Sequence, residues 1–171
     1  MNRTVTTIRS IARLAPMILL LLLTLTDGGE ARSLRIGDRL APVSLPDLSG
    51  RQVASAAQPG KTVVIYFWTD ACGCREQLLE LKPYVAGLKQ RPVLFHAVNA
   101  GQEKGKVSRF VAENRIPYEV LLDDRARLAR EQFGIKVLPT IFVIDKGGVL
   151  REKLIGVVET KKLQAIINRY L

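Results

Sequence analysis

Residues 62–68 read Thr-Val-Val-Ile-Tyr-Phe-Trp, and no charged or turn-forming residue interrupts them. A continuous run of β-branched and aromatic residues is typical of a strand that is buried on both faces. Such a strand needs a layer of structure on each side of its sheet. In a chain of 171 residues, of which 47% are apolar, this strand predicts a single α/β domain rather than a disordered chain.

The remaining patterns predict the order of the elements around this strand. We expect strands at 42–46, 52–54, 92–98, 140–144 and 149–156, a short extended piece at 118–122, and helices at 75–89, 107–114, 128–133 and 159–171. A turn at 145–148 joins the last two strands. This order predicts a mixed central sheet flanked by helices on both faces, with an N-terminal β-hairpin extension.

The first residues have the composition of an export signal. Residues 1–16 carry three arginines and no acid, and an apolar run follows at 17–26. This run is shorter than the roughly 20 residues that span a membrane, and it matches the core of a signal peptide. Gly29 and Ala31 supply the small residues of a cleavage site.

These features divide the chain into three parts. We expect residues 1–31 to be a signal peptide, residues 32–39 a linker and residues 40–171 the folded domain. Export across a bacterial-type inner membrane would make the protein periplasmic, with no stable membrane insertion after cleavage. An uncleaved short anchor is the alternative. Because no cysteine lies near the cleavage site, a lipoprotein anchor is excluded.

The side-chain inventory excludes several classes of site. Two cysteines are too few for a disulfide scaffold or a four-cysteine metal site, and one histidine, His96, excludes a multi-histidine site. The net charge is +10, but the basic residues are scattered between acids and form no stripe interleaved with aromatic residues. We therefore expect no nucleic-acid partner.

The two cysteines lie where a buried strand gives way to a helix. Cys72-Gly73-Cys74 follows the strand at 62–68 after a short loop, and the helix expected at 75–89 begins directly after it. The unpaired amides of a helix N-terminus stabilise a nearby anion, and Arg75 would add to this effect. Since a thiolate is the nucleophile of disulfide exchange, the position favours a redox-active pair.

Residues along nearly the whole domain carry a family resemblance. The matching positions are Gly50, Lys61, Phe67-Trp68, the cysteines with Arg75-Glu76, Gly134-Ile135, the run 138–145 that begins Leu138-Pro139, Gly148 and Gly156. With these residues the chain resembles the TlpA-like thioredoxins, which are exported thiol–disulfide oxidoreductases and include the thioredoxins of cytochrome c maturation.

The resemblance implies a thioredoxin-like domain at 40–171 and roles for several residues. Cys72 and Cys74 would be the catalytic pair. Pro139 would be a cis-proline against the cysteines, and it would dock the partner's backbone together with Leu138. Trp68 belongs to the core and would form a wall beside Cys72. The expected partners are periplasmic protein thiols and disulfides, with a membrane-bound electron donor as one candidate, and no metal or organic cofactor is needed.

The chain departs from the family pattern around the cysteines. The family has two residues between its cysteines and a Trp before the first, whereas here Gly73 stands alone between them and Ala71 precedes them. Gln77 occupies a position where many members have Glu, and Tyr66 one where many have Asp or Asn. The usual acid–base group is therefore missing from its family position.

The shortened spacing also has a geometric consequence. Two residues of a regular helix turn through about 200°, so helical geometry would aim the two sulfurs apart. The backbone must leave that geometry for a disulfide to form, and Gly73 is the residue best able to do so. A Cys72–Cys74 disulfide is therefore expected to be strained and more easily reduced than an ordinary one.

Three other readings of the cysteines stay open. Thr69-Asp70-Ala71-Cys72 matches part of the peroxiredoxin motif, so Cys72 could be a peroxidatic thiolate and Cys74 its resolving thiol. Two thiolates also suit Cu(I) binding or delivery, with His96 as the one nitrogen ligand. The third reading is a pair of inert buried thiols.

Overall fold

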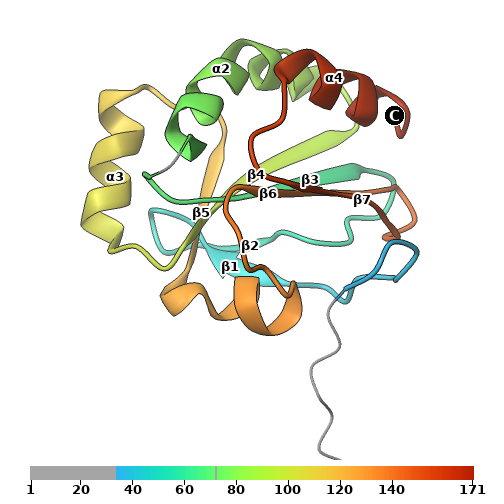
Figure 1. Cartoon of the computed structure of the whole chain (residues 1–171), viewed down its shortest axis with the longest axis horizontal. Helices are drawn as coiled ribbons and strands as arrows, with labels where there is room; N and C mark the ends of the chain where they lie inside the picture. The colour runs from blue at the N-terminus through green and yellow to red at the C-terminus, as the bar shows by residue number, and fades with distance from the viewer. Residues whose placement is uncertain (1–33, 72) are drawn as a thin grey trace, which may run out of the picture. The chain divides into compact units, whose positions relative to one another are not determined.

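A computed structural model describes residues 34–71 and 73–171 (Figure 1). The signal peptide expected at 1–31, the first residues of the expected linker and Cys72 lie outside this part of the chain. Within the described residues, no helix has the length and the hydropathy needed to cross a membrane.

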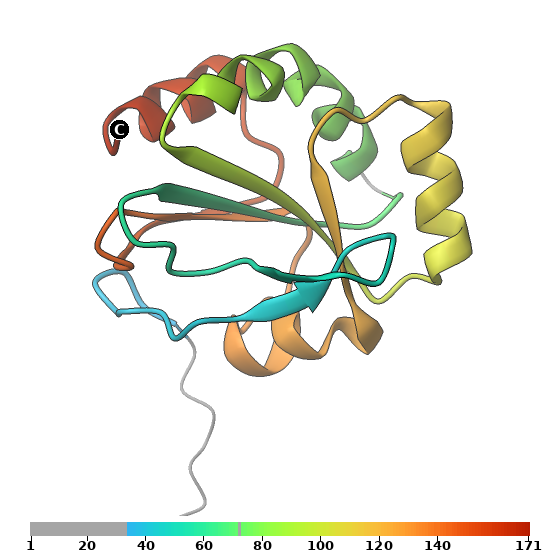
Figure 2. The same ribbon diagram turned by 180° about the vertical axis from the view of Figure 1, so that it is seen from behind.

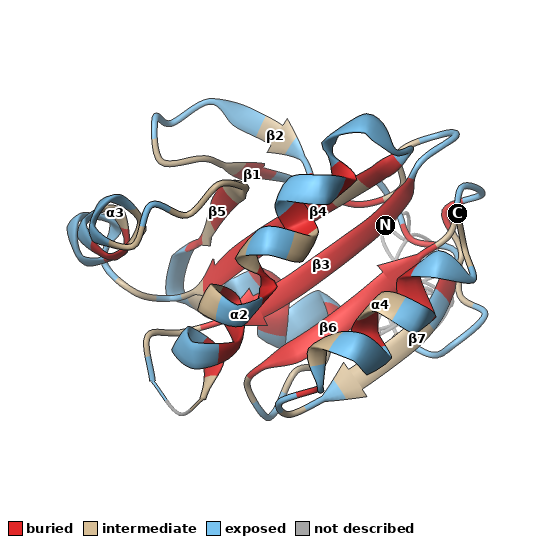
Figure 3. Cartoon of the chain, turned by 90° about the horizontal axis from the view of Figure 1, so that it is seen from above, coloured by how far each residue is buried: buried red, intermediate tan, exposed pale blue. Residues whose placement is uncertain are grey.

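A five-stranded sheet forms the centre of the domain. Its strand order is β5 (Glu119–Asp123), β4 (Val93–Ala100), β3 (Thr62–Trp68), β6 (Thr140–Ile144) and β7 (Leu150–Ile155). β3 is parallel to β4 and antiparallel to β6. Every residue of β3 is buried, as the unbroken apolar run predicts, and Figure 3 shows this strand crossing the middle of the sheet.

Two helices lie over one face of this sheet, and a third stands to one side of it. They are α2 (Cys74–Gly87), which ends in a short 3-10 turn η3 (Leu88–Gln90), α3 (Lys104–Glu113) and α4 (Thr160–Asn168). In Figures 1 and 3, α2 and α4 lie side by side over the sheet. Their apolar sides form one core cluster with the sheet, in which Leu81, Phe110 and Leu163 are buried.

The opposite face is covered by shorter segments. A hairpin of β1 (Ser44–Pro46) and β2 (Gln52–Ala54) lies there with two short helical turns, η4 (Asp124–Ala126) and η5 (Leu128–Gln132) (Figure 2). Their apolar side chains form a second cluster with the sheet, which includes Leu45 and Phe133. The mixed, helix-flanked sheet and the N-terminal hairpin were both predicted from the sequence and are confirmed.

The helix expected at 128–133 takes an unusual form. η5 is a π-helical turn, and its first amides are held by the buried carboxylate of Asp123, which accepts hydrogen bonds from the Leu128 amide at 2.9 Å and the Ala129 amide at 2.8 Å. Burial raises the pKa of Asp123. The local apolar pattern predicted a helix but could not predict a cap from the preceding strand.

Residues just before Leu40 lie along the start of β7. The Gly37 amide donates to the Leu150 carbonyl at 2.8 Å, and the Leu150 amide donates to the Asp38 carbonyl at 2.9 Å. Arg39 forms an isolated antiparallel bridge with Val149. This segment therefore pairs with the first residues of the edge strand β7, whereas Ile155 lies at the other end of that strand.

Candidate redox site

β3 delivers the chain to the cysteine loop. Trp68 is the last residue of β3 and is fully buried, which confirms its place in the core. Phe67 lies opposite Thr140 in the antiparallel pairing, so Pro139 lies next to the end of β3. The Leu138–Pro139 peptide bond is cis, as the family resemblance implied. Pro139 is buried, and Leu138 is partly buried against both core clusters.

Gly73 and Cys74 start the helix that follows. Gly73 has φ 74° and ψ −12°, which is the left-handed region that glycine adopts without strain. The backbone therefore leaves right-handed helical geometry between the two cysteine positions. Cys74 is the first residue of α2, and its exposed fraction is 0%. A Cβ atom at Gly73 would lie 3.0 Å from Cγ2 of Val157, so the loop after β7 approaches this turn closely.

Two residues that depart from the family pattern meet beneath Cys74. The Tyr66 hydroxyl lies 3.1 Å from the Cys74 carbonyl oxygen and 3.2 Å from Oε1 of Gln77. The Gln77 side-chain amide in turn donates to the Val158 carbonyl. Burial, with a smaller contribution from Cys74, raises the pKa of Tyr66 far above its usual range. The polar groups of this cluster are therefore neutral at physiological pH.

Asp70 fastens the loop before the cysteines to residues that follow β4. Lys106 Nζ lies 2.8 Å from Asp70 Oδ2, and the Asp70 amide donates to Oε1 of Gln102 at 2.9 Å. The Gln102 side-chain amide donates to Asp70 Oδ1, and the buried Asn99 amide donates to Gln102 Oε1 at 2.7 Å. Lys106 holds the pKa of Asp70 below its usual range. This clamp fastens the loop to the start of α3.

Arg75, the second residue of α2, contacts an aromatic ring on α3. Its guanidinium lies 5.4 Å from the centre of the Phe110 ring on α3, a cation–π distance. Phe110 also packs against Trp68, with ring centroids 5.2 Å apart. The first turn of α2, the end of β3 and α3 therefore share one aromatic contact.

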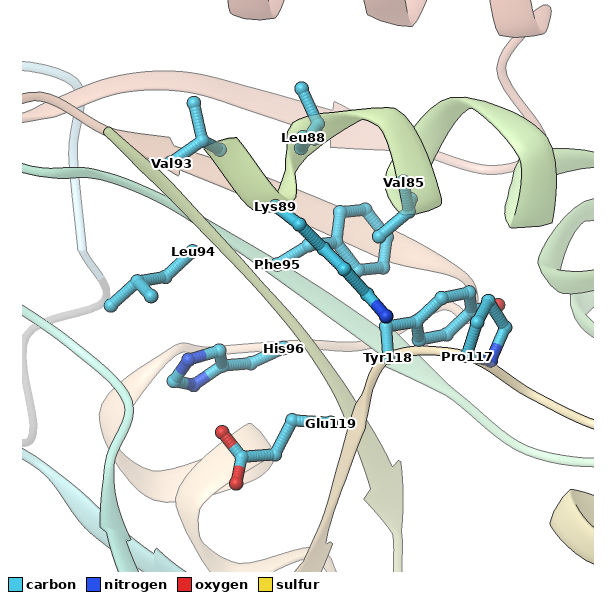
Figure 4. Close-up of a pocket in the computed structure, with 10 residues that line it drawn as sticks. All are labelled: Val85, Leu88, Lys89, Val93, Leu94, Phe95, His96, Pro117, Tyr118 and Glu119. Atoms are coloured by element: carbon cyan, nitrogen blue, oxygen red, sulfur yellow. The ribbon is translucent and has the colours of Figure 1, made fainter. Parts of the chain in front are cut away.

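The structure does not bring His96 to the end of β3, where the cysteine loop begins. His96 lies opposite Ile65 in the middle of β3, three strand residues or about 10 Å before Trp68. His96 is among the residues that line a cavity of about 250 Å³. In Figure 4 its ring lies near the side chain of Glu119. Burial lowers the pKa of His96 to about 4. Within the described residues, which exclude Cys72, no group of three or more His, Cys, Asp or Glu side chains is placed to hold a metal ion.

Sequence reasoning missed the Asp70 clamp and the bonding of Tyr66. Asp70 and Lys106 are far apart in the sequence, and neither stands in a pattern that marks an ion pair. The sequence places Tyr66 in the core and marks it as a departure from the family, but it does not predict the partners of its hydroxyl. The one signal available was that Tyr66 and Gln77 depart from the pattern together.

With this geometry established, comparison with known proteins identifies the family. A model described as the AhpC/TSA family matches residues 36–153. The chain belongs to the AhpC/TSA family.

Named relatives agree on the kind of protein. A thiol-disulfide oxidoreductase ResA from Bacillus cereus is 25% identical over 141 residues, which are 82% of this chain and 81% of the relative. The crystal structure of a Chlorobium tepidum protein assigned as thiol:disulfide interchange protein DsbE is 27% identical, with a TM-score of 0.73, and covers 81% of this chain and 99% of that one. These matches confirm the predicted thioredoxin fold and the predicted class, thiol–disulfide oxidoreductase.

A third similarity concerns the fold alone. The crystal structure of a peroxiredoxin-like protein from Aquifex aeolicus has a TM-score of 0.71 and 16% identity, and covers 82% of this chain and 90% of that one. A protein described as peroxiredoxin-like therefore shares this fold, so the fold alone does not decide between the two kinds of chemistry.

Proposed function

We propose that this protein exchanges electrons with protein disulfides through Cys72 and Cys74. The observation that carries the proposal is that β3 ends beside the cis-proline Pro139 and leads into a loop that places Cys74 at the first position of α2. The amide dipoles at this helix start favour the anionic form of a thiol. The position of Cys74 at this helix start supports the proposal that the two cysteines act there as a redox pair.

The reaction balances as two exchanges. The Cys72 thiolate attacks one sulfur of the partner's disulfide, so that a Cys72–partner bond forms, the partner's S–S bond breaks and its other sulfur leaves as a thiolate. The Cys74 thiolate then attacks the Cys72 sulfur, which releases the partner's second thiolate and leaves a Cys72–Cys74 disulfide. Two electrons pass from the pair to the partner, and the two protons lost by the cysteines are taken up by the partner's thiolates. Run backwards, the same steps oxidise a partner.

The surrounding residues have supporting roles in this proposal. Gly73 supplies the left-handed turn that a one-residue spacing requires. Leu138 and Pro139 offer backbone beside the loop for a partner's chain, and Trp68 supports the loop from the core. Because the Tyr66 and Gln77 cluster is neutral, we propose that protons reach the cysteines from water or from the partner rather than from a buried carboxylic acid.

Trapping of partners tests the proposal. In a Cys74→Ser variant the first exchange can occur but the second cannot, so mixed disulfides with exported proteins should accumulate at Cys72. A Cys72→Ser variant is the matched control, and it should trap none. If Cys74→Ser captures no partner through a reducible bond, the oxidoreductase proposal is wrong.

The place and direction of the exchange belong to the same proposal. The expected signal peptide supports a periplasmic site of action, and the resemblance supports a role in cytochrome c biogenesis with a membrane-bound donor. The expected strain in a Cys72–Cys74 disulfide favours oxidation or isomerisation of partners, whereas the family more often reduces them. Equilibration with glutathione measures this: a reduction potential below that of ordinary thioredoxins would contradict the expected strain.

A peroxidase is the second candidate, because the family match and the peroxiredoxin-like fold both allow it. The Cys72 thiolate would then attack a peroxide oxygen, giving a sulfenic acid and water, and Cys74 would condense with it to a disulfide and a second water. Consumption of hydrogen peroxide by the reduced protein, faster than by the Cys72→Ser variant, would favour this candidate.

A further inference from the structure

Exposed apolar side chains gather around the redox site. In the described part of the chain the large hydrophobic side chains with high exposure are Ile36, Val137, Ile155 and Val157, at 65%, 53%, 62% and 60%. Three of these four adjoin the site. Val137 comes two residues before Pro139, Ile155 lies opposite Thr140, and Val157 approaches Gly73. We call Val137, Ile155 and Val157 the apolar rim.

A basic hollow lies against this rim. It has a volume of about 270 Å³, and Lys136, Val137, Thr140, Lys153 and Ile155 are among the residues that line it. The described residues of its lining include two lysines and no acid. Lys153 Nζ lies 5.5 Å from the centre of the Phe142 ring, which holds this ammonium group near the hollow.

From these surfaces we propose that the protein selects disulfides carried on an extended segment that has apolar and acidic side chains beside the cysteine. This inference rests on the proposed oxidoreductase function and names its substrate class. When a partner covers exposed valine and isoleucine side chains, the burial of their apolar surface stabilises the complex. The two lysines attract a carboxylate and disfavour a basic segment, which gives the surface a charge preference as well as an apolar one.

The apolar rim adjoins the redox site, which indicates that a disulfide-bearing segment of the partner covers it. The Gly156 amide donates to the Pro139 carbonyl at 2.8 Å, so the rim residues on either side of Gly156 are fastened to the cis-proline. A chain segment that docks on Pro139 therefore comes close to the rim residues on either side of Gly156. β7 is an edge strand of the sheet. The segment around Gly37 pairs with β7 at Leu150, which is five strand residues, or about 17 Å, from Ile155.

The remaining exposed side chain, Ile36, offers a matched control. It is as exposed as Ile155 but lies in the segment that pairs with the remote end of β7. Replacement of either isoleucine by threonine keeps a β-branched side chain and removes apolar surface. Threonine also suits the exposed position of Val137, so none of these variants disturbs the core.

The experiment compares the reduced protein on two disulfide peptides and on 2-hydroxyethyl disulfide. One peptide carries Leu, Val and Asp beside its cysteines, and the other carries Ser, Thr and Asn. The measured quantity is the second-order rate constant with each peptide divided by that with the small disulfide. In the wild type this ratio should be about tenfold higher for the apolar acidic peptide. In a Val137→Thr/Ile155→Thr variant most of this preference should disappear, and in Ile36→Thr it should remain.

The charge preference is tested separately. In a Lys136→Gln/Lys153→Gln variant the apolar peptide with Asp should lose its advantage over the same peptide with Asn, while both should stay better than the polar peptide. Equal ratios for all peptides in the wild type, or equal losses in Ile36→Thr and in the rim variant, overturn the inference but leave the oxidoreductase function intact. Failure to reduce even 2-hydroxyethyl disulfide overturns the proposed function itself.

Discussion

At the scale of single residues, the cluster beneath Cys74 is the main departure from the family. Tyr66 and Gln77 stand at positions where the family pattern has Asp or Asn and Glu, respectively, and in the structure these two side chains meet. The Tyr66 hydroxyl and Gln77 Oε1 lie 3.2 Å apart, and both residues are almost fully buried. The two residues therefore belong to one buried polar cluster, in which the Tyr66 hydroxyl also contacts the Cys74 carbonyl oxygen and the Gln77 side-chain amide donates to the Val158 carbonyl.

Replacement of Tyr66 by phenylalanine tests this pair. The variant removes a hydroxyl that contacts both Cys74 and Gln77, and it leaves Gln77 Oε1 buried without that partner. We expect the free energy of unfolding, measured with urea, to fall by about 1–2 kcal/mol. Tyr84→Phe is the matched control, because within the described residues the buried Tyr84 hydroxyl has no hydrogen-bond partner. An equal loss of unfolding free energy in both variants would show that the contact between Tyr66 and Gln77 does not stabilise the protein.

His96 predicts a pH dependence of stability. Its folded pKa of about 4 lies below the value of 6.5 of an unfolded chain, so the unfolded state binds the proton more readily. The stabilising effect of a neutral His96 is complete above pH 6.5 and is lost as the pH falls toward 4. From pH 7 to pH 5 the free energy of unfolding should fall by about 2 kcal/mol from this residue alone.

A His96→Leu variant isolates this effect, because leucine fills the buried position without titrating. Urea unfolding at pH 7 and pH 5 should show a smaller loss in the variant than in the wild type. The same loss in both proteins would assign the pH dependence to other groups.

At the scale of elements, the loop between β3 and α2 is held by partners from a different part of the chain. Asp70 joins it to the turn after β4 and to the first turn of α3. α3 has no acidic side chain in its first turn, and Lys106 stands there, where a cation opposes the helix dipole. Glu103 caps this helix by accepting from the Gly105 amide, and Asp70 adds a second carboxylate, which pairs with Lys106 and fixes the loop to the helix.

An Asp70→Ala variant should loosen this loop. We expect hydrogen exchange at residues 69–71 and at the start of α3 to become faster, and the free energy of unfolding to fall by about 1 kcal/mol. Asp124→Ala is the control. Asp124 is also an aspartate in an ion pair, but its pair with Arg125 is 3.7 Å long and almost fully exposed, so this variant should change neither quantity. Unchanged exchange in Asp70→Ala would mean that the loop is held by its backbone alone.

At the scale of the whole molecule, the fold was largely predictable and the details of the site were not. The runs at 62–68 and 140–144 predicted their strands to the residue, because buried strands demand unbroken apolar sequence. The cis bond before Pro139 followed from the family resemblance and not from the proline itself. The Asp70 clamp and the left-handed Arg125 and Ala126 depend on contacts that only the folded chain creates, so no local pattern predicts them.

The organisation of the whole chain makes one further prediction. If residues 1–31 are a signal peptide, the full-length protein produced in a bacterium with a periplasm should be recovered from that compartment with Arg32 at its N-terminus. Mass spectrometry of the periplasmic and membrane fractions measures this directly. Recovery of the uncleaved chain in the membrane fraction would instead support the short anchor.

The chain contains one tryptophan, and the fold places it where the chemistry is expected. Trp68 is fully buried in the same cluster as Cys74, and its ring packs on Phe110, which also contacts Arg75 at the start of the redox helix. Indole emission responds to the polarity and the quenching groups around it. The protein therefore carries its own optical probe: oxidation, reduction and partner capture at the cysteines can be followed by fluorescence in real time, without a label.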